Sequence, residues 1–451
     1  MAVRGWCLVG LLALSVSAVA AERPIGSPEP VLEPSKLALI PEAVRLQVAA
    51  GQIPGAIVLV ARNDKVVFVE ARGVAHPGGQ QPLTADQIFG AGSLTKAVTA
   101  VAVMMLVEDG RLGLDEPVSR YIPEFGGTKQ VRVLEPGSPP PPFSALPGPV
   151  PPKASWGEPR YSLQPANRPV TLRMLLNHTS GMQIYGVDNA SPRHGPGDTL
   201  ATFVPNLAAA PLEFQPGSRW AYSNSIGYEV LARVVEVAAG MDFRRFLQER
   251  LFAPLGMTET DFGVKRALVA RGLPFMPGFP PPIAEDTVYF SGSAGLWTTV
   301  GDWSLFARML AHDGSFYGRQ FLKPETLRQM AADQIGPLTM QGYPFLGLPT
   351  EGLSFGLGLM SVANPEVAGT RLPAGSFGWN GDGTRLFWVV PGERLAIVSF
   401  VPLVGSQAAP LQRSLEAIVM AATVGSSPPP AGPGPPSVVS SQGRSGHKDL
   451  Y

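Results

Sequence analysis

The chain has 451 residues, of which 45% are apolar, so it can bury a large core. Its 35 lysines and arginines equal its 35 aspartates and glutamates, and the formal net charge is zero. Because a nucleic-acid-binding surface needs clustered positive charge to displace counterions from phosphates, this composition excludes that class of protein.

The first 21 residues have the pattern of an export signal. Arg4 supplies a positive start, residues 8–19 are mostly apolar, and Ala18-Val19-Ala20 matches the small-x-small site of signal peptidases. An uncleaved membrane anchor is the alternative, but the apolar run is short for a bilayer span. We therefore expect an exported protein, periplasmic or secreted, with no stable membrane insertion.

Metal-binding patterns are absent from the sequence. The only cysteine, Cys7, lies within the expected signal, so the rest of the chain offers neither a disulfide nor a thiolate ligand. The five histidines are scattered, and no pair has the spacing of a zinc motif. We expect no metal and no other cofactor.

Strand patterns lie near both ends of the chain, and helical patterns lie between them. Residues 55–62 and 65–72 read as two strands joined by a hairpin turn at Asn63-Asp64. Residues 93–109 read as a helix, which Gly110 ends at the favoured C-terminal capping position. Further helices are predicted at 225–239, 243–252, 302–312 and 410–424, and further strands at 355–362, 384–390 and 395–401.

This order of elements predicts an α+β fold. An antiparallel sheet built from both termini, flanked by helices and with an inserted helical region, accommodates it. We assign a single domain to residues 22–425, with a proline-rich surface insertion at 135–159. Residues 426–451 are rich in Pro, Gly and Ser, and we expect them to form a disordered tail.

The most informative local pattern is Phe89-Gly-Ala-Gly-Ser93-Leu-Thr-Lys96. A serine and a lysine three residues apart at a helix start project from one face of that helix. The helix N-terminus favours a nearby oxyanion, and a lysine kept neutral by its surroundings can accept the serine proton. The tail also contains S-x-x-K, at Ser445 and Lys448, but it has no scaffold to hold the geometry.

Two further segments complete a candidate site. In Trp220-Ala-Tyr222-Ser-Asn224, the tyrosine can act as a base beside an ammonium, and the amide of Asn224 can orient Lys96. The segment Trp379-Asn380-Gly381-Asp382 precedes a predicted strand, where glycine lets a backbone approach a ligand closely. The amides of Asp382 and Ser93 are then expected to form an oxyanion hole.

Together these motifs resemble those of class C β-lactamases, penicillin-binding proteins and family VIII carboxylesterases, in which S-x-x-K, Y-x-N and a glycine-ended tripeptide follow in this order. The surrounding segments 108–115, 170–181, 251–257 and 292–296 are similar as well, and the resemblance covers residues 40–421. It implies a β-lactamase/transpeptidase-like fold and a covalent acyl-enzyme route. In that route Ser93 attacks a carbonyl, and Lys96 and Tyr222 move its proton to the leaving group.

The third motif departs from the usual Lys-Thr-Gly of β-lactamases, whose cation holds the substrate carboxylate. Trp379-Asn380-Gly381 brings no charge and is similar to the carboxylesterase version, although Arg385 lies four residues beyond Gly381. An aromatic platform and an amide suit uncharged esters. We therefore expect a small-molecule ester or amide substrate, with small neutral esters first and β-lactams or D-amino-acid peptides as the alternative.

Other residues compete for functional roles. Ser354, in Gly352-Leu-Ser354-Phe-Gly356, matches a nucleophile elbow, but a strand pattern follows it where that mechanism needs a helix. His178, near a helix end, is expected to satisfy local backbone groups. Pocket lining or ordinary core is expected for the aromatics Phe275, Phe279, Tyr289, Phe290, Tyr343 and Phe345. An inactive exported binding protein with a vestigial pocket is the alternative from another class.

Overall fold

A computed structural model gives the structure of the chain. It describes residues 32–138, 159–183, 192–274, 280–340, 350–382 and 384–423. The expected signal at 1–21, most of the proline-rich insertion at 135–159 and the expected tail at 426–451 lie outside the described residues. The aromatics Phe275, Phe279, Tyr343 and Phe345 lie outside them as well.

Seven antiparallel strands form the central sheet, in the order β2-β1-β13-β12-β11-β10-β9. They are β1 (Gly55–Arg62), β2 (Lys65–Gly73), β9 (Leu353–Phe355), β10 (Met360–Val362), β11 (Phe377–Gly381), β12 (Arg385–Val390) and β13 (Leu395–Phe400). The N-terminal strand β1 pairs with the last strand β13, with Leu59 opposite Val398. This confirms the predicted α+β sheet built from both ends of the chain.

The turns explain where the strands begin and end. Asn63 adopts a left-handed φ of 53° between β1 and β2, as the predicted hairpin requires. The single strand predicted at 355–362 is wrong, because Gly358 has a φ of 81° and the chain turns back on itself there. Phe355 in β9 consequently pairs with Met360 in β10.

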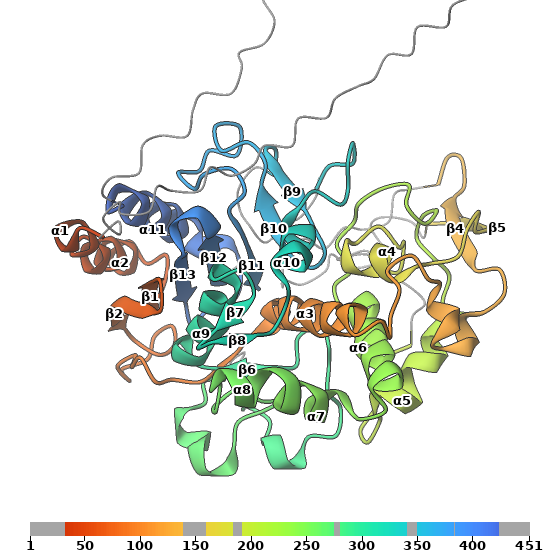
Figure 1. Ribbon diagram of the computed structural model, residues 1–451, viewed down its shortest axis with the longest axis horizontal. Helices are drawn as coiled ribbons and strands as arrows, with labels where there is room; N and C mark the ends of the chain where they lie inside the picture. The colour runs from red at the N-terminus through yellow and green to blue at the C-terminus, as the bar shows by residue number, and fades with distance from the viewer. Residues whose placement is uncertain are drawn as a thin grey trace, which may run out of the picture.

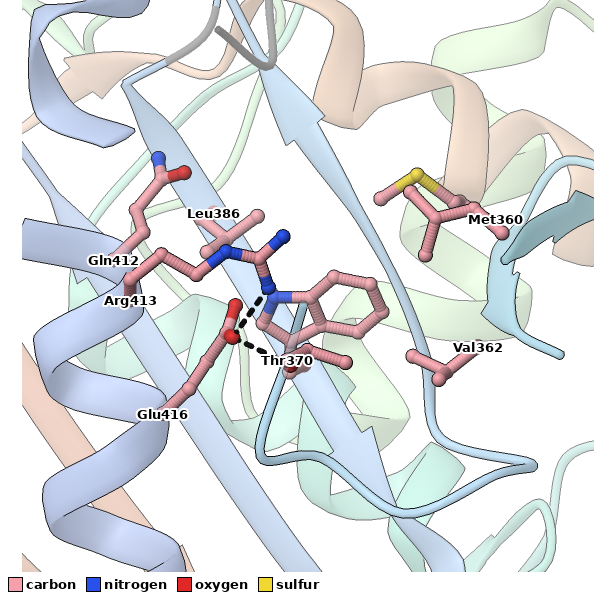
Figure 2. A pocket seen from close by; sticks show the side chains of 9 residues that line it. Met360, Val362, Thr370, Leu386, Gln412, Arg413 and Glu416 are labelled. Atoms are coloured by element: carbon pink, nitrogen blue, oxygen red, sulfur yellow. Dashed lines mark hydrogen bonds and ion pairs between the residues drawn. The ribbon is translucent and has the colours of Figure 1, made fainter. Parts of the chain in front are cut away.

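Helices cover both faces of the sheet (Figure 1). On one face lie α1 (Pro34–Leu37), α2 (Ile40–Ala49) and α11 (Ala409–Ala421). Figure 2 shows the pocket between α11 and the sheet, where Glu416 accepts hydrogen bonds from Thr370 Oγ1 at 2.6 Å and Arg413 Nη1 at 2.7 Å. Leu386 of β12 also lines this pocket.

The opposite face meets α9 (Val300–Ala311), because Phe387, next to Leu386, packs on the rings of Trp303 and Phe306. The inserted helical region beyond it comprises α3 (Thr95–Glu108), α4 (Leu172–Leu176), α5 (Leu200–Phe203), α6 (Ile226–Ala239), α7 (Phe243–Leu247), α8 (Ala253–Leu255) and α10 (Pro324–Ala331). The predicted helix 243–252 becomes α7 followed by a π-helical segment, Gln248–Phe252.

Among the residues that the structure describes, three strand pairs lie outside the main sheet. They are β3 (Phe89–Gly90) with β6 (Trp297–Thr298), β4 (Gln130–Leu134) with β5 (Tyr161–Pro165), and β7 (Ser315–Phe316) with β8 (Arg319–Gln320). Within the described ranges, no helix combines the length and the apolar character that crossing a membrane requires.

Helix α3 is the centre of the molecule, between the sheet and helices α4, α5 and α6 (Figure 1). Every residue from Thr95 to Leu106 is buried, which follows from a sequence that is apolar on all sides. A 3-10 turn, Gly92–Leu94, leads into α3, and Gly110, with a φ of 71°, follows its end. The turn that carries the candidate nucleophile is therefore fixed by the most buried helix of the fold.

Candidate active site

Ser93 lies in the turn before α3, directly beside β11. Two glycines make this approach possible: a Cβ at Gly381 would overlap the carbonyl oxygen of Ala91, and a Cβ at Gly92 would overlap the carboxylate of Asp382. Ser93 is 7% exposed, whereas Lys96 is 1% exposed. The serine is thus the more accessible member of a buried pair.

The structure brings the three predicted catalytic residues together around the serine oxygen. Lys96 Nζ donates to Ser93 Oγ at 3.0 Å, and Tyr222 OH donates to the same oxygen at 2.7 Å. The lysine and serine come from one helix start, whereas Tyr222 comes from the segment before α6. Both groups lie within the distance that proton transfer requires.

The surroundings of Lys96 change its chemistry. Burial lowers the pKa of this amine from 10.5 to about 7, although the charges of Glu229 and Asp382 oppose the change. The amine lies 5.1 Å from the ring centroid of Tyr222 and 5.6 Å from that of Tyr228. A neutral amine is therefore well populated near neutral pH, as a base requires.

His178 supports the segment that carries Tyr222. Its carbonyl accepts from the amide of Ala221 at 3.1 Å, its Nδ1 accepts from the amide of Ser223 at 3.2 Å, and its ring lies 4.7 Å from that of Tyr222. Burial, and then the charge of Lys96, hold its pKa well below the usual value. His178 therefore stays neutral and acts on backbone groups, as the sequence predicted.

Asn224 does not orient Lys96 as the sequence predicted. Its side chain is exposed, because the segment turns outward between Ser223 and the start of α6. The second acceptor of the Lys96 amine is instead the carbonyl oxygen of Ser293, at 3.0 Å. Asn224 remains at the surface two residues from Tyr222.

The third motif forms strand β11, and its residues alternate between the two faces. Trp379 is fully buried, with its ring 5.7 Å from Tyr222 and 5.1 Å from Phe355. Asn380 is also fully buried, and it pairs with Leu386, whose side chain faces α11. Trp379 thus packs behind Tyr222, whereas Asn380 is directed to the other face of the sheet.

Asp382 follows β11 with an unusual backbone. Its φ is 54°, a left-handed conformation that costs a non-glycine residue roughly 1 kcal/mol or more. Its carboxylate lies against the Ser93 turn and 3.9 Å from Arg385 Nη1, and burial raises its pKa. Arg385 is itself 2% exposed and donates to the carbonyl of Leu403 at 3.0 Å. The two opposite charges thus lie close together, with the arginine buried and the aspartate partly exposed.

Three residues of the site were missed by the sequence analysis. Glu229 is a buried acid in the otherwise apolar start of α6, and it binds the segment that contains Ser293. Gln183 Oε1 accepts from the amides of Ser225 and Ile226 and so caps α6. A lone acid in an apolar helical segment was a visible signal for Glu229, but no local pattern pointed to Ser293 or Gln183.

The competing candidates have other partners. Ser354 lies in β9 and its hydroxyl donates to Asp333 Oδ1 at 2.7 Å, without the strand-turn-helix geometry of a nucleophile elbow. Tyr289 stacks on His194 at 4.1 Å, and Phe290 packs on Phe262 at 5.2 Å. Across the ranges that the structure describes, no group of three or more His, Cys, Asp or Glu side chains is placed to hold a metal ion.

Comparisons with known proteins agree with this geometry. The family model described as Beta-lactamase matches residues 40–419. Protein Rv1367c of Mycobacterium tuberculosis (strain ATCC 25618 / H37Rv) is 31% identical over 74% of this chain and 81% of its own length. Esterase EstB of Burkholderia gladioli is 28% identical over 73% of this chain and 81% of its own.

A likeness to solved structures extends over most of the fold. Simvastatin synthase (LovD) from Aspergillus terreus has a TM-score of 0.65 at 23% identity, over 87% of this chain and 99% of that one. This likeness confirms the expected β-lactamase/transpeptidase-like architecture.

Proposed function

The chain belongs to the beta-lactamase family of serine hydrolases, and from this premise we propose that it cleaves small neutral carboxylic esters through an acyl-enzyme intermediate. The observation that carries the proposal is the meeting of Lys96 and Tyr222 on Ser93 Oγ, with a lysine whose pKa is about 7. A serine hydroxyl needs such a neighbour before it can act as a nucleophile.

Acylation uses these three groups in order. Neutral Lys96 accepts the proton of Ser93 while Oγ forms a bond to the ester carbonyl carbon. When the bond to the leaving oxygen breaks, Tyr222 donates its proton to that oxygen, and the protonated lysine then returns one proton to the tyrosine, so that both groups are neutral again. The alcohol leaves and the acyl group stays on the serine.

Deacylation reverses the proton transfers. Water attacks the acyl carbon, its proton moves to the same lysine and tyrosine, and the acid leaves as Ser93 Oγ regains a proton. The amides of Ser93 and Asp382 stabilise the oxyanion in both steps, because β11 lies directly against the nucleophile turn.

The preference for uncharged substrates rests on the partners of the charged groups. Arg385, the cation nearest the third motif in the sequence, is buried and matched by the carboxylate of Asp382. A substrate carboxylate would therefore gain no ion pair from this arginine and would face Asp382. The buried Trp379 behind Tyr222 adds an apolar wall to the site. Asn224 is exposed two residues from Tyr222, and substrate contact by its amide is part of this proposal.

Hydrolysis of p-nitrophenyl acyl esters of increasing chain length tests this proposal against nitrocefin and D-Ala-D-Ala peptides. We expect kcat/KM for at least one ester to exceed that for both other substrates, and we expect Ser93→Ala to abolish all turnover. Strong cleavage of nitrocefin or the peptides, with feeble ester cleavage, would instead favour the β-lactamase or peptidase alternative.

A fluorophosphonate probe tests the non-enzymatic alternative. We expect one covalent adduct, which maps to Ser93 by mass spectrometry. An inactive binding protein would gain no adduct, whatever it binds.

Export of the protein is a separate proposal, which rests on the pattern of residues 1–21. We expect the mature protein outside the cytoplasm to begin at Ala21 or Glu22. N-terminal sequencing of the protein from its native host would decide this, because an intact Met1 would contradict cleavage.

A further inference from the structure

We propose that Glu229 is a positioning residue, which holds the segment of residues 291–293 in the conformation that presents the Ser293 carbonyl to the Lys96 amine. This inference rests on the proposed role of Lys96 as the base.

Glu229 collects three hydrogen bonds from this one short segment. Its Oε1 accepts from Ser291 Oγ at 2.5 Å and from Ser293 Oγ at 2.6 Å, and its Oε2 accepts from the amide of Gly292 at 3.1 Å. The glutamate is 4% exposed, so these contacts are made away from water. A buried carboxylate with this many donors is fixed in place and fixes its donors in turn.

The carbonyl groups of residues 292 and 293 point away from Glu229, toward helix α3. The Ser293 hydroxyl donates to Glu229 of α6, but the Ser293 carbonyl accepts from Lys96 Nζ at 3.0 Å. The Gly292 carbonyl accepts from Thr99 Oγ1 at 2.7 Å. Lys96 and Thr99 both lie on α3. The segment therefore bridges α6 and α3, with its donors on one side and its acceptors on the other.

Close packing leaves the bridge little freedom. A Cβ at Gly292 would overlap the Tyr228 carbonyl and the Ala232 side chain, both on α6. Only glycine lets the segment approach the helix this closely. The position of the Ser293 carbonyl is thus set by contacts with Glu229 and with the α6 backbone.

Glu229 also acts on Lys96 through its charge. Burial has the dominant effect and lowers the pKa of this lysine. Two nearby charges raise that pKa, and the charge of Glu229 has a larger effect than that of Asp382. The remaining groups around the amine are the phenols of Tyr222 and Tyr228 and the neutral imidazole of His178. Tyr289 lies close enough to Glu229 for the carboxylate to raise its pKa, after the larger effect of burial. Without the carboxylate, the amine would be neutral at lower pH.

The variant Glu229→Gln tests the inference, because glutamine keeps the shape but loses the charge and one acceptor. We expect kcat to fall about tenfold to a hundredfold, since small displacements of a reacting group cost this much. We also expect the acid limb of the kcat/KM profile to move to lower pH, which a merely structural role would not produce. Unchanged kcat and an unchanged acid limb would overturn the inference.

Glu236→Gln is the matched control. Glu236 lies on the same helix, but its carboxylate binds Arg233 and the amide of Phe243. We expect this variant to keep the wild-type acid limb. If both variants moved the limb equally, the effect would come from the charge of α6 as a whole, and the specific role of Glu229 would be wrong.

Two further measurements separate this inference from the proposed function. The rate at which a fluorophosphonate labels Ser93 also depends on the lysine, so its pH profile reports on Glu229 even if the wild type cleaves no ester. If Glu229→Gln fails to fold, the double variant Ser291→Ala/Ser293→Ala removes two of the three contacts and leaves the charge. We expect it to lose kcat, and wild-type kcat and labelling would overturn the inference.

Discussion

The proposed mechanism puts Ser93, Lys96 and Tyr222 on one proton path, so their individual losses are expected not to add. We expect Ser93→Ala to lower kcat/KM by about 10³-fold or more, and Lys96→Ala and Tyr222→Phe to lose comparable amounts. The double variant Lys96→Ala/Tyr222→Phe should be little worse than either single change. Steady-state kinetics on a p-nitrophenyl ester measures this.

Ser354→Ala is the control for this series, because Ser354 lies in β9 and its hydroxyl donates to Asp333. We expect it to keep a rate near the wild type. A dead Ser354→Ala variant would restore the nucleophile elbow, and independent, additive losses in the double variant would indicate a different base.

The pH dependence of catalysis should report on Lys96. The lysine must be neutral to accept the serine proton, and its pKa is about 7. We therefore expect kcat/KM to rise about tenfold per pH unit below pH 7 and to level off above it. A profile that is flat from pH 5 to pH 9 would contradict the assignment of Lys96 as the base.

The same burial should make Lys96 costly for stability. Because its pKa falls from 10.5 in the unfolded chain to about 7, the charged form opposes folding fully below pH 7, and the penalty fades between pH 7 and pH 10.5. We expect Lys96→Met to be inactive but to raise Tm, more at about pH 6 than at about pH 10. Thermal unfolding of both proteins at these two pH values checks the sign, and a lower Tm for Lys96→Met at pH 6 would contradict it.

Local spacing was sufficient to predict some site residues but not others. Ser93 and Lys96 are three residues apart at a helix start, so one local conformation brings them together. Asn224 depended on which way the chain turns after Tyr222, and that turn is set by Gln183 and by the packing of His178. The second partner of Lys96, the Ser293 carbonyl, comes from a segment far along the chain, so local spacing could not predict it.

At the scale of elements, the contact between β11 and the nucleophile turn should be sensitive to a single methyl group. A Cβ at Gly381 would overlap the Ala91 carbonyl, so Gly381→Ala must push the strand and the Asp382 amide away from Ser93. We expect kcat to fall by about 10²-fold with the fold retained. Circular dichroism and ester kinetics measure the two effects.

Gly392→Ala is the control for this change, because Gly392 lies in the turn between β12 and β13 with open space where a Cβ would lie. We expect it to have wild-type kinetics. Equal rates for Gly381→Ala and the wild type would mean that the contact does not position the oxyanion hole.

Elements with regular patterns were predicted nearly to the residue, and irregular ones were not. The helix predicted at 225–239 is α6, Ile226–Ala239, because its apolar face has an unbroken helical period. The strand predicted at 355–362 is two strands, because alternation of apolar residues cannot show that Gly358 reverses the chain. Turns depend on φ values that a local pattern does not fix.

At the scale of the whole molecule, the order of strands and helices was sufficient to predict the sheet. The bridge between α6 and α3 was not predictable, since it joins residues far apart in the chain. The sheet also predicts which truncations are tolerated. A chain that ends at Glu393 lacks β13 and α11, which leaves β1 paired on one side only, with β2.

We expect this shortened chain to be insoluble or unfolded, whereas a chain that ends at Ser426 keeps every described element and should keep wild-type Tm and activity. Expression yield, Tm and ester cleavage measure both. A folded, active protein that ends at Glu393 would show that β13 is dispensable.

The pairing of β1 with β13 also sets the earliest moment at which the nascent chain can fold. Leu59 leaves the ribosome on the order of half a minute before Val398, its partner across the sheet. During that interval β1 can pair with β2 but not with β13, its other neighbour in the sheet. A leader at the N-terminus would therefore reach the translocation machinery while the chain is still unfolded and able to pass through a channel. Holdase chaperones would bind the β1 segment of this unfolded chain.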